Sequence, residues 1–404
     1  MKTVFILVLT ALFQVQCNKP TKVSRPDPRE QPPAEQGDQA TQLPSGDTGR
    51  LPGGNQPPAT IPVPGNGMNG NGNPPVITPV PPLPPGTPPP SAGMPAPEPS
   101  DPAPPAGNLP APGPLPPASE PTGDVHVFWL NFGNLGFSGG QVYRAAADGS
   151  GAKGLAKTGT APDGIAVDAA GGKIYWSNMG SPLGTGGGSL QRSNLDGSGV
   201  EEIVSARATG TRTPKQIQLD VKGRHVYWCD REGAKVFRAS MDKANDAVVL
   251  ASGSRFDQLV GIALDPGGQK IYFTDRNKGI IYRMGMAMPA GSTAANRSDI
   301  EEFIRVGNPI DLDLDLEAGL IYWTDRKNGK IYSAGLSNPS TSTKVLVDGL
   351  NEPIGIALDG EGNFYFTELG LAGGGKVWRA AVDGTGRKAI SGNANYTGVA
   401  VARF

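Results

Sequence analysis

The sequence predicts an all-β protein in which a six-bladed β-propeller follows a disordered, proline-rich segment. Three observations lead to this prediction. A motif of two aromatic residues, one further residue and then Asp, Asn or Glu occurs six times between residues 125 and 404. A short apolar stretch ending in Asp precedes most copies of this motif. The 41 prolines are unevenly spread, since 33 of them lie in residues 1–124.

Residues 1–17 are predicted to be a signal peptide. Lys2 is followed by an apolar run from Val4 to Phe13, which is too short to span a bilayer as a helix. Cys17 comes next and polar sequence follows at once, an arrangement that resembles a bacterial lipoprotein signal. The resemblance implies lipidation of Cys17 and anchoring in a membrane, with cleavage and secretion as the alternative. In both cases we expect the protein outside the cytoplasm.

Residues 18–124 are expected to form a disordered Pro/Gly-rich linker. No aromatic residue occurs between Cys17 and Asp124, so this stretch cannot bury enough apolar surface to offset its chain entropy. Proline runs such as residues 81–90 favour a polyproline II conformation, which extends by about 3 Å per residue. The linker is therefore expected to act as a semi-rigid stalk, and a ligand for proline-recognising domains is the alternative role.

Residues 125–404 are predicted to form the propeller, and the repeat of the aromatic motif is the reason. One match to a four-residue pattern would carry little weight, whereas six at a near-constant period predict a repeat architecture. The copies begin at Phe128, Tyr175, Tyr227, Tyr272, Tyr322 and Tyr365, at intervals of 47, 52, 45, 50 and 43 residues.

Each repeat contains the strands of one four-stranded blade. An apolar strand such as residues 261–265 precedes the motif, and another, such as residues 281–283, follows it. Asp-Gly turns, as in residues 148–151, suit tight hairpins because Gly tolerates positive φ, and a fourth apolar strand completes the unit. The region begins with the second strand of its first blade. Residues 397–401 repeat the pattern of the missing inner strand, so we expect the last strand to close the ring.

These motifs closely resemble the YWTD (low-density lipoprotein receptor class B) repeats, which form six-bladed propellers. Residues 322–325 are the family motif letter for letter, and the resemblance covers all six repeats. It implies a domain that binds other proteins and is not known for catalysis. This chain has neither six-cysteine EGF modules nor a transmembrane helix in its sequence, so we do not expect receptor signalling or endocytosis.

The aromatic motif itself is expected to be structural. Successive side chains of a strand point to opposite faces, where large rings can pack between neighbouring blades. The Thr and Asp of the motif are expected to satisfy backbone groups. Cys229 stands where other repeats have Ser or Thr, so we expect a buried free thiol.

Composition excludes several classes of function. The chain has 36 Lys and Arg against 37 Asp and Glu, which gives no strongly basic field for nucleic acid or an anionic membrane surface. Two histidines and two cysteines leave little for histidine-based catalysis or a zinc site. We therefore expect no cofactor and no enzymatic activity, and we expect a monomer.

Asp311 and Asp313 are the exceptional residues of the inner strands. Most other inner strands carry Gly and Ala at these two positions. Residues two apart on a strand share a face, so the two carboxylates should point the same way. Three interpretations stay open: hydrated lining of the channel, ligands for a structural Ca²⁺ or similar cation, and a catalytic role.

The loops that follow the motif predict the binding surface. Blades three, four and five have tight basic turns after the motif, whereas blades six, one and two have longer Gly-rich loops with apolar residues. Exposed apolar clusters beside charge are typical of interaction surfaces, but these loops could instead fold back and cover the channel mouth. The candidate binding residues are Phe132, Leu135, Phe137, Met179, Leu183, Arg231, Arg276, Arg326, Leu369 and Leu371.

The functional hypothesis is a non-enzymatic binding protein that displays a YWTD-like propeller on a stalk and holds a protein or glycan. Membrane association is expected only through lipid at Cys17. One alternative is a Ca²⁺-dependent hydrolase that resembles the gluconolactonases, to which only Asp311, Asp313 and Asn308 could contribute ligands. A purely structural envelope component is the other alternative.

Overall fold

The computed structural model describes residues 123–134, 138–180, 187–371 and 374–404. Three predicted features lie wholly or almost wholly outside these ranges: the signal peptide, Cys17 and the linker. Three predicted binding residues, Leu135, Phe137 and Leu183, also lie outside them. Within the described ranges no helix is long and apolar enough to cross a membrane.

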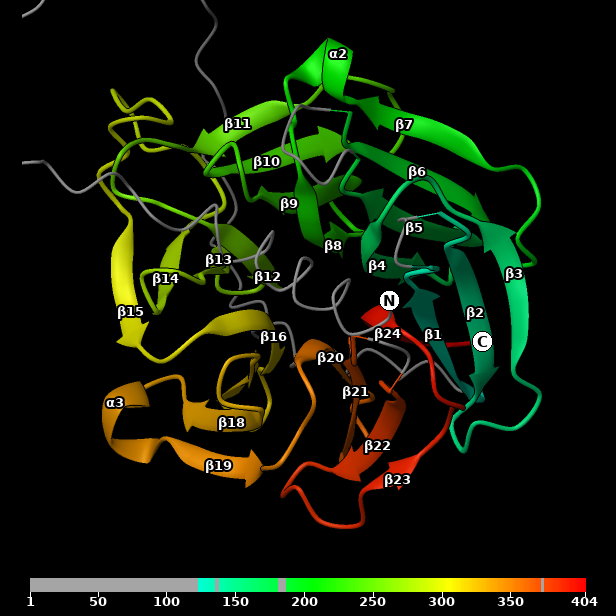
Figure 1. The fold of residues 1–404 in the computed structure, drawn as a ribbon. Helices are drawn as coiled ribbons and strands as arrows, with labels where there is room; N and C mark the ends of the chain where they lie inside the picture. The colour runs from blue at the N-terminus through cyan, green and yellow to red at the C-terminus, as the bar shows by residue number, and fades with distance from the viewer. Residues whose placement is uncertain (1–122, 135–137, 181–186, 372–373) are drawn as a thin grey trace, which may run out of the picture. The chain divides into compact units, whose positions relative to one another are not determined.

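The described residues form six four-stranded antiparallel sheets arranged in a ring, which confirms the predicted six-bladed propeller (Figure 1). We number the blades by the order of their motifs. Blade 1 contains β24 (Tyr396–Arg403), β1 (Val125–Asn131), β2 (Gln141–Ala146) and β3 (Lys153–Lys157), and blade 2 contains β4 (Pro162–Asp168), β5 (Lys173–Asn178), β6 (Ser189–Asn194) and β7 (Glu201–Ser205). Blade 3 contains β8 (Pro214–Asp220), β9 (His225–Asp230), β10 (Lys235–Ser240) and β11 (Val248–Ala251), and blade 4 contains β12 (Leu259–Asp265), β13 (Lys270–Asp275), β14 (Ile280–Gly285) and β15 (Glu301–Arg305). Blade 5 contains β16 (Pro309–Asp315), β17 (Leu320–Asp325), β18 (Lys330–Gly335) and β19 (Lys344–Val347), and blade 6 contains β20 (Pro353–Leu358), β21 (Asn363–Glu368), β22 (Val377–Ala381) and β23 (Lys388–Ala389). Two single-turn helices, α2 (Ala206–Thr209) and α3 (Pro339–Ser342), lie in connections.

The ring is closed by the last strand, as the sequence predicts. β24 pairs antiparallel with β1 and becomes the inner strand of blade 1, so the two ends of the propeller share one sheet. The register aligns Val125 with Arg403 and Trp129 with Val399. Closure leaves no inner sheet edge open between the first and last blades.

The aromatic residues of the motif pack between blades, which confirms their structural role. Each blade adds buried strands to clusters shared with its neighbour; for example, one cluster joins Tyr227 of blade 3 with Phe273 of blade 4. In five of the six blades the second ring of the motif stacks on an aromatic residue of the third strand, whereas in blade 2 Trp176 donates to Gln191. The stacked pairs include Trp129–Tyr143, Trp228–Phe237, Phe273–Tyr282, Trp323–Tyr332 and Phe366–Trp378.

The third residue of the motif links neighbouring inner strands. In blade 5 the Thr324 hydroxyl accepts a hydrogen bond from the Asp311 backbone N–H and donates to the Ile354 carbonyl of blade 6 at 2.7 Å. The equivalent bonds run from Ser177 to Lys215, Cys229 to Gly261, Thr274 to Ile310 and Thr367 to Thr397. In blade 1 the third motif residue is Leu130, and Thr397 of the inner strand β24 donates to Pro162 instead. These bonds satisfy buried backbone groups all the way around the channel.

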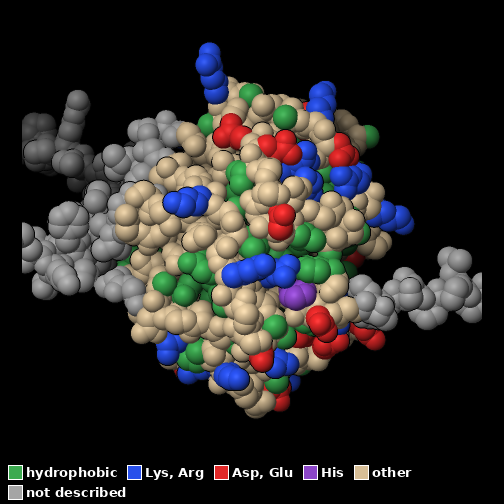
Figure 2. Space-filling model, turned by 90° about the vertical axis from the view of Figure 1, so that its right-hand side faces the viewer, with side chains coloured by type: hydrophobic (Ala, Val, Ile, Leu, Met, Phe, Trp, Pro, Cys, Tyr) green, Lys and Arg blue, Asp and Glu red, His purple; other side chains and the backbone are tan. Residues whose placement is uncertain are grey.

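The outer edges of the blades carry charge. The outer strand of blade 1, β3, exposes Lys153 and Lys157. The outer strand of blade 2, β7, exposes Glu201 and Glu202. Figure 2, a view from the right-hand side of Figure 1, shows side chains of both signs spread over this side of the molecule. Charged edge strands discourage pairing with strands of another chain.

Candidate functional site

Six equivalent positions surround one mouth of the channel. The connection after the motif and the connection that enters the inner strand lie on the same face of each blade, which we call the motif-loop face; the other is the turn face. In every blade the residue after the motif donates its backbone N–H to the carbonyl of the residue directly before an inner strand. These six residues, the mouth ring, are Phe132, Met179, Arg231, Arg276, Arg326 and Leu369, with N–H donation to Asn395, Ala161, Thr213, Gln258, Asn308 and Glu352.

The motif acid holds the same two connections together. Asp275 accepts the backbone N–H groups of Asp257 at 2.7 Å and Lys278 at 3.1 Å. Asp325 likewise accepts those of Asn308 and Asn328. The predicted backbone role of this residue is confirmed, and it fixes where the mouth ring lies.

The apolar half of the mouth ring is buried. Phe132, Met179 and Leu369 are only 4%, 7% and 5% exposed, and Leu371 packs partly buried against them. They form one cluster with the start of the inner strands, completed by Ala161, Val260, Ile310 and Ile354. The described parts of these loops therefore fold over the channel mouth, the alternative that the sequence left open. Contact of these residues with a ligand stays a prediction.

The basic half of the mouth ring is held by neighbouring side chains. Arg326 in blade 5 donates from Nε and a terminal nitrogen to Glu352 Oε1, at 3.1 and 2.5 Å. Arg276 donates to the Gln258 side-chain oxygen, and Arg231 donates from Nε to Glu232 at 2.6 Å. Arg231 is buried, whereas Arg276 and Arg326 remain partly exposed. The guanidinium groups are thus oriented in advance, with two carboxylates beside them.

A buried ion pair lies just below the mouth ring. Lys215 at the start of β8 pairs with Asp163 at the start of β4, and its ammonium also lies 3.1 Å from the Met179 sulfur. Gln216 donates to the second oxygen of Asp163 at 3.1 Å. Burial lowers the pKa of Lys215 to about 8; Asp163 opposes this shift, and the charges of Arg231 and Arg276 add to it. Neither residue stands out in the sequence, because no motif or repeat signal links Asp163 to Lys215.

Asp311 and Asp313 point the same way, as predicted, and bind the neighbouring inner strand. Asp311 accepts the N–H of Ile356 at 3.1 Å, and Asp313 accepts that of Leu358 at 2.8 Å. Burial raises the pKa of Asp311 well above its ordinary range and that of Asp313 to about 6, despite hydrogen bonds that oppose both shifts. Their role as links between blades 5 and 6 accounts for both carboxylates.

The residues of the Ca²⁺ alternative are spread along β16 and the loop before it. Among the residues that the structure describes, no group of three or more His, Cys, Asp or Glu is placed to hold a metal ion. Asn308, the third residue of the Ca²⁺ alternative, donates its side-chain amide to the Arg276 carbonyl and lies at the motif-loop face. Asp313 instead borders the turn face.

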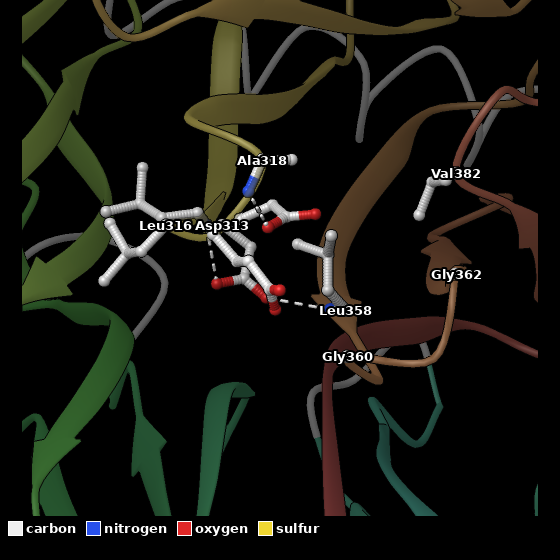
Figure 3. Close-up of a pocket in the computed structure, with 10 residues that line it drawn as sticks. Asp313, Leu316, Ala318, Leu358, Gly360, Gly362 and Val382 are labelled. Atoms are coloured by element: carbon white, nitrogen blue, oxygen red, sulfur yellow. Dashed lines mark hydrogen bonds between the residues drawn. The ribbon is translucent and has the colours of Figure 1, made fainter. Parts of the chain in front are cut away.

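A pocket opens on the turn face beside Asp313. It has a volume of about 610 Å³ and lies between the ends of β16 and β20 (Figure 3). Its lining combines Asp313, Asp315 and Glu317 with apolar residues such as Leu316 and Leu358. The Asp313 carboxylate lies at the edge of this pocket and accepts the backbone N–H of Leu358 (Figure 3).

Comparisons with known proteins agree with this fold. No protein-family model matches the chain. Low-density lipoprotein receptor-related protein 1 of Pyricularia oryzae is 34% identical over 241 residues, which cover 53% of this chain and 76% of that protein. The 3-hydroxyacyl-CoA dehydrogenase-like protein LAM1 of Cochliobolus heterostrophus is 32% identical over 167 residues, but these cover only 34% of that protein and 38% of this chain. Among solved structures, a chain of the nidogen/laminin complex matches with a TM-score of 0.54 and 20% identity, covering 69% of this chain and 98% of that one.

Proposed function

Because this chain belongs to the low-density lipoprotein receptor-related family of YWTD propellers, we propose that it is a non-enzymatic protein that binds another protein outside the cytoplasm. The binding surface is the motif-loop face, and the linker and N-terminal leader present it at a distance from a membrane or from a point of attachment.

The split mouth ring is the observation that carries this proposal. Three contiguous blades, 6, 1 and 2, place apolar residues at the ring, and the three others place Arg231, Arg276 and Arg326 there. The apolar half is buried, so the accessible side chains of the ring are Arg276 and Arg326. Oriented guanidinium groups of this kind are typical of protein interfaces, where Arg is enriched and forks onto carboxylates.

The position at which the chain enters the propeller supports display of this face. β1 ends at the motif, on the motif-loop face, so its start at Val125 and the preceding Asp124 lie on the turn face. Asp124, the predicted last residue of the linker, is therefore separated from the motif-loop face by the length of β1. The predicted boundaries, a signal peptide of residues 1–17 and a linker of residues 18–124, belong to this proposal.

A protein ligand is favoured over a glycan. Carbohydrate sites commonly stack sugar rings on accessible aromatic faces, and among the described residues no Trp or Tyr side chain is exposed. The arrangement of titratable groups also favours binding over catalysis, since Asp311 and Asp313 are engaged by backbone N–H groups and Lys215 is buried against Asp163.

The test compares capture of partners by the full chain and by two variants. The first is the Arg231→Ala/Arg276→Ala/Arg326→Ala triple variant, which should lose a partner that the wild type retains after crosslinking on intact cells. The second variant, Arg276→Glu/Arg326→Glu, keeps buried Arg231 and changes only the two partly exposed arginines. It therefore tests the same surface if the triple variant does not fold. A Lys222→Ala/Lys243→Ala/Lys344→Ala variant removes three exposed charges elsewhere and serves as the control. Equal capture by all four proteins contradicts this face as the binding surface.

A further inference from the structure

A groove lies between blades 3 and 4, apart from the mouth ring. It is bounded by the connection from β11 to β12 on one side and by strands β14 and β15 on the other, and has a volume of about 460 Å³. We call it the inter-blade groove. Its lining consists of Arg255, Lys278, Ile280, Tyr282, Ile300, Glu302 and Arg305.

The floor of this groove is apolar and its rim is basic. Ile280 and Tyr282 are 2% and 4% exposed and belong to the core shared by blades 3 and 4. Arg255, Lys278 and Arg305 are exposed at the rim, so the charges border a buried apolar surface. An apolar floor with a few charged groups at its edge is typical of a binding site.

The charge of the rim is unbalanced. Three cationic side chains face one carboxylate, Glu302, which pairs with Arg305 on the same strand. Within the described part of the chain, neither Arg255 nor Lys278 forms an ion pair; the Lys278 ammonium donates to the Arg255 carbonyl and so ties the two ends of the rim. Asp257, a nearby carboxylate on the loop, accepts from the Asn277 side chain at 3.4 Å and does not line the groove.

We propose that the inter-blade groove binds an extended acidic segment of a protein, with aliphatic side chains against half-buried Ile300 and carboxylates on Arg255, Lys278 and Arg305. This inference rests on the proposed protein-binding function but assigns a second site. The rim offers no exposed aromatic ring on which a sugar could stack, so an acidic peptide fits its chemistry better than an acidic glycan.

The groove starts in the same turn as the mouth ring. Lys278 lies two residues after Arg276 in the connection between β13 and β14. A partner on the motif-loop face could therefore extend an acidic segment outward between the two blades. A ligand carboxylate could displace the Glu302 carboxylate from the Arg305 guanidinium, which would then remain paired.

The test measures binding of a fluorescein-labelled peptide of Glu and Leu residues to the full-length protein by fluorescence anisotropy. We expect binding that weakens as ionic strength rises toward about 0.15 M. The Arg255→Glu/Arg305→Glu variant reverses two exposed charges and should bind at least about tenfold more weakly. The matched control, Lys222→Glu/Lys243→Glu, reverses two exposed charges on the turn face and should bind within about threefold of wild type.

Each other outcome is informative. No binding to wild type, or equal loss in the groove and control variants, overturns the inference. An alginate oligomer that competes as well as the unlabelled peptide assigns the groove to a glycan and also overturns it. A third outcome is that peptide binding is lost in the Arg231→Ala/Arg276→Ala/Arg326→Ala variant but not in the groove variant. The peptide then binds at the mouth ring, which overturns the groove proposal and not the proposed function.

Discussion

The Asp313 carboxylate on β16 accepts a hydrogen bond from the Leu358 backbone N–H on β20 at 2.8 Å. The inner edge of β20 faces the channel, and its N–H groups have no strand to pair with on that side. Asp313 and, two residues earlier, Asp311 supply acceptors where most other inner strands have Gly and Ala. Ionisable side chains therefore link blades 5 and 6, and the free energy of unfolding should depend on their protonation and so on pH.

The first prediction is a difference in pH dependence between wild type and Asp313→Asn. Burial raises the pKa of Asp313 from its ordinary value near 4 to about 6, so between these values the folded protein binds more protons than the unfolded chain. Its contribution to the unfolding free energy falls as pH rises through this window, by on the order of 1–2 kcal/mol after allowance for partial exposure. Thermal melting from about pH 4 to 7 should show a larger loss in wild type than in Asp313→Asn. This variant keeps an acceptor for Leu358 and retains only the contribution of Asp311, whose pKa burial also raises.

An exposed carboxylate gives the control for this experiment. Hydrogen bonds from Thr385 lower the pKa of Asp383, so its replacement by Asn should change the pH profile in the opposite direction. Parallel profiles for wild type and Asp313→Asn would contradict the account of the blade 5–6 contact.

The second prediction concerns Thr324, the third residue of the motif in blade 5. Its hydroxyl accepts from the Asp311 N–H and donates to the Ile354 carbonyl, and all of these groups are buried. Thr324→Val keeps the shape but leaves a donor and an acceptor unsatisfied, so it should cost about 2–4 kcal/mol in denaturant unfolding. Thr324→Ser keeps the hydroxyl, as Ser177 does in blade 2, and should cost about 1 kcal/mol or less. A loss in Thr324→Val no larger than that in Thr324→Ser would contradict the dominant role of the hydroxyl.

The sequence predicts the ring well because its signals are local and repeated. The aromatic motif fixes strands and blade number, and the resemblance of residues 397–401 to the inner strands predicts closure. Alternation along β16 also predicts Asp311 and Asp313 on one side, and both do bind β20, although Asp311 lies within a register shift between Pro309 and Leu312.

The mouth of the channel is harder to predict for a physical reason. The pairing of each of β4 and β8 with its neighbour shifts register between the first and fourth residues of the inner strand. Asp163 and Lys215 occupy the second residue, inside this irregular stretch, so alternation does not say where they point. Their pairing also joins residues 52 apart, and no repeat signal connects them. The burial of Phe132 and Met179 follows from contacts between blades, which one repeat does not encode.

The third prediction tests closure of the ring. Removal of residues 396–404 deletes β24 and with it the inner strand of blade 1 and the bond from Thr397 to Pro162. The inner edges of β1 and β4 would be left without their neighbour, so we expect loss of the cooperative thermal transition. Unchanged melting would mean that the blades are closed in another way. A shorter deletion of Phe404 alone, which stacks on His126 at the end of the strand, should lower the melting temperature only slightly.

The fourth prediction concerns the thiol of Cys229. This side chain is completely buried between blades 3 and 4, and burial raises its pKa well above the ordinary value. The thiolate is the reactive form, so in a Cys17→Ser background the native protein should resist an aromatic disulfide reagent and react fully once unfolded in guanidinium. Rapid labelling of the folded protein would contradict the packing between these blades.

The fifth prediction concerns the ion pair beneath the mouth ring. Lys215→Met leaves the Asp163 carboxylate buried without its cation and should cost about 3–5 kcal/mol of unfolding free energy. The Asp163→Asn/Lys215→Met double variant removes both charges, so it should be less destabilised than the sum of the two single variants. The exposed pair of Arg305 and Glu302 gives the comparison, and its coupling should stay below about 1 kcal/mol. Additive losses at Asp163 and Lys215 would show that the pair contributes no coupling. The Lys215 ammonium contacts Met179, so strong coupling would mean that a buried charge pair supports the apolar half of the mouth ring. A ligand that displaces Met179 must then hydrate or replace this contact.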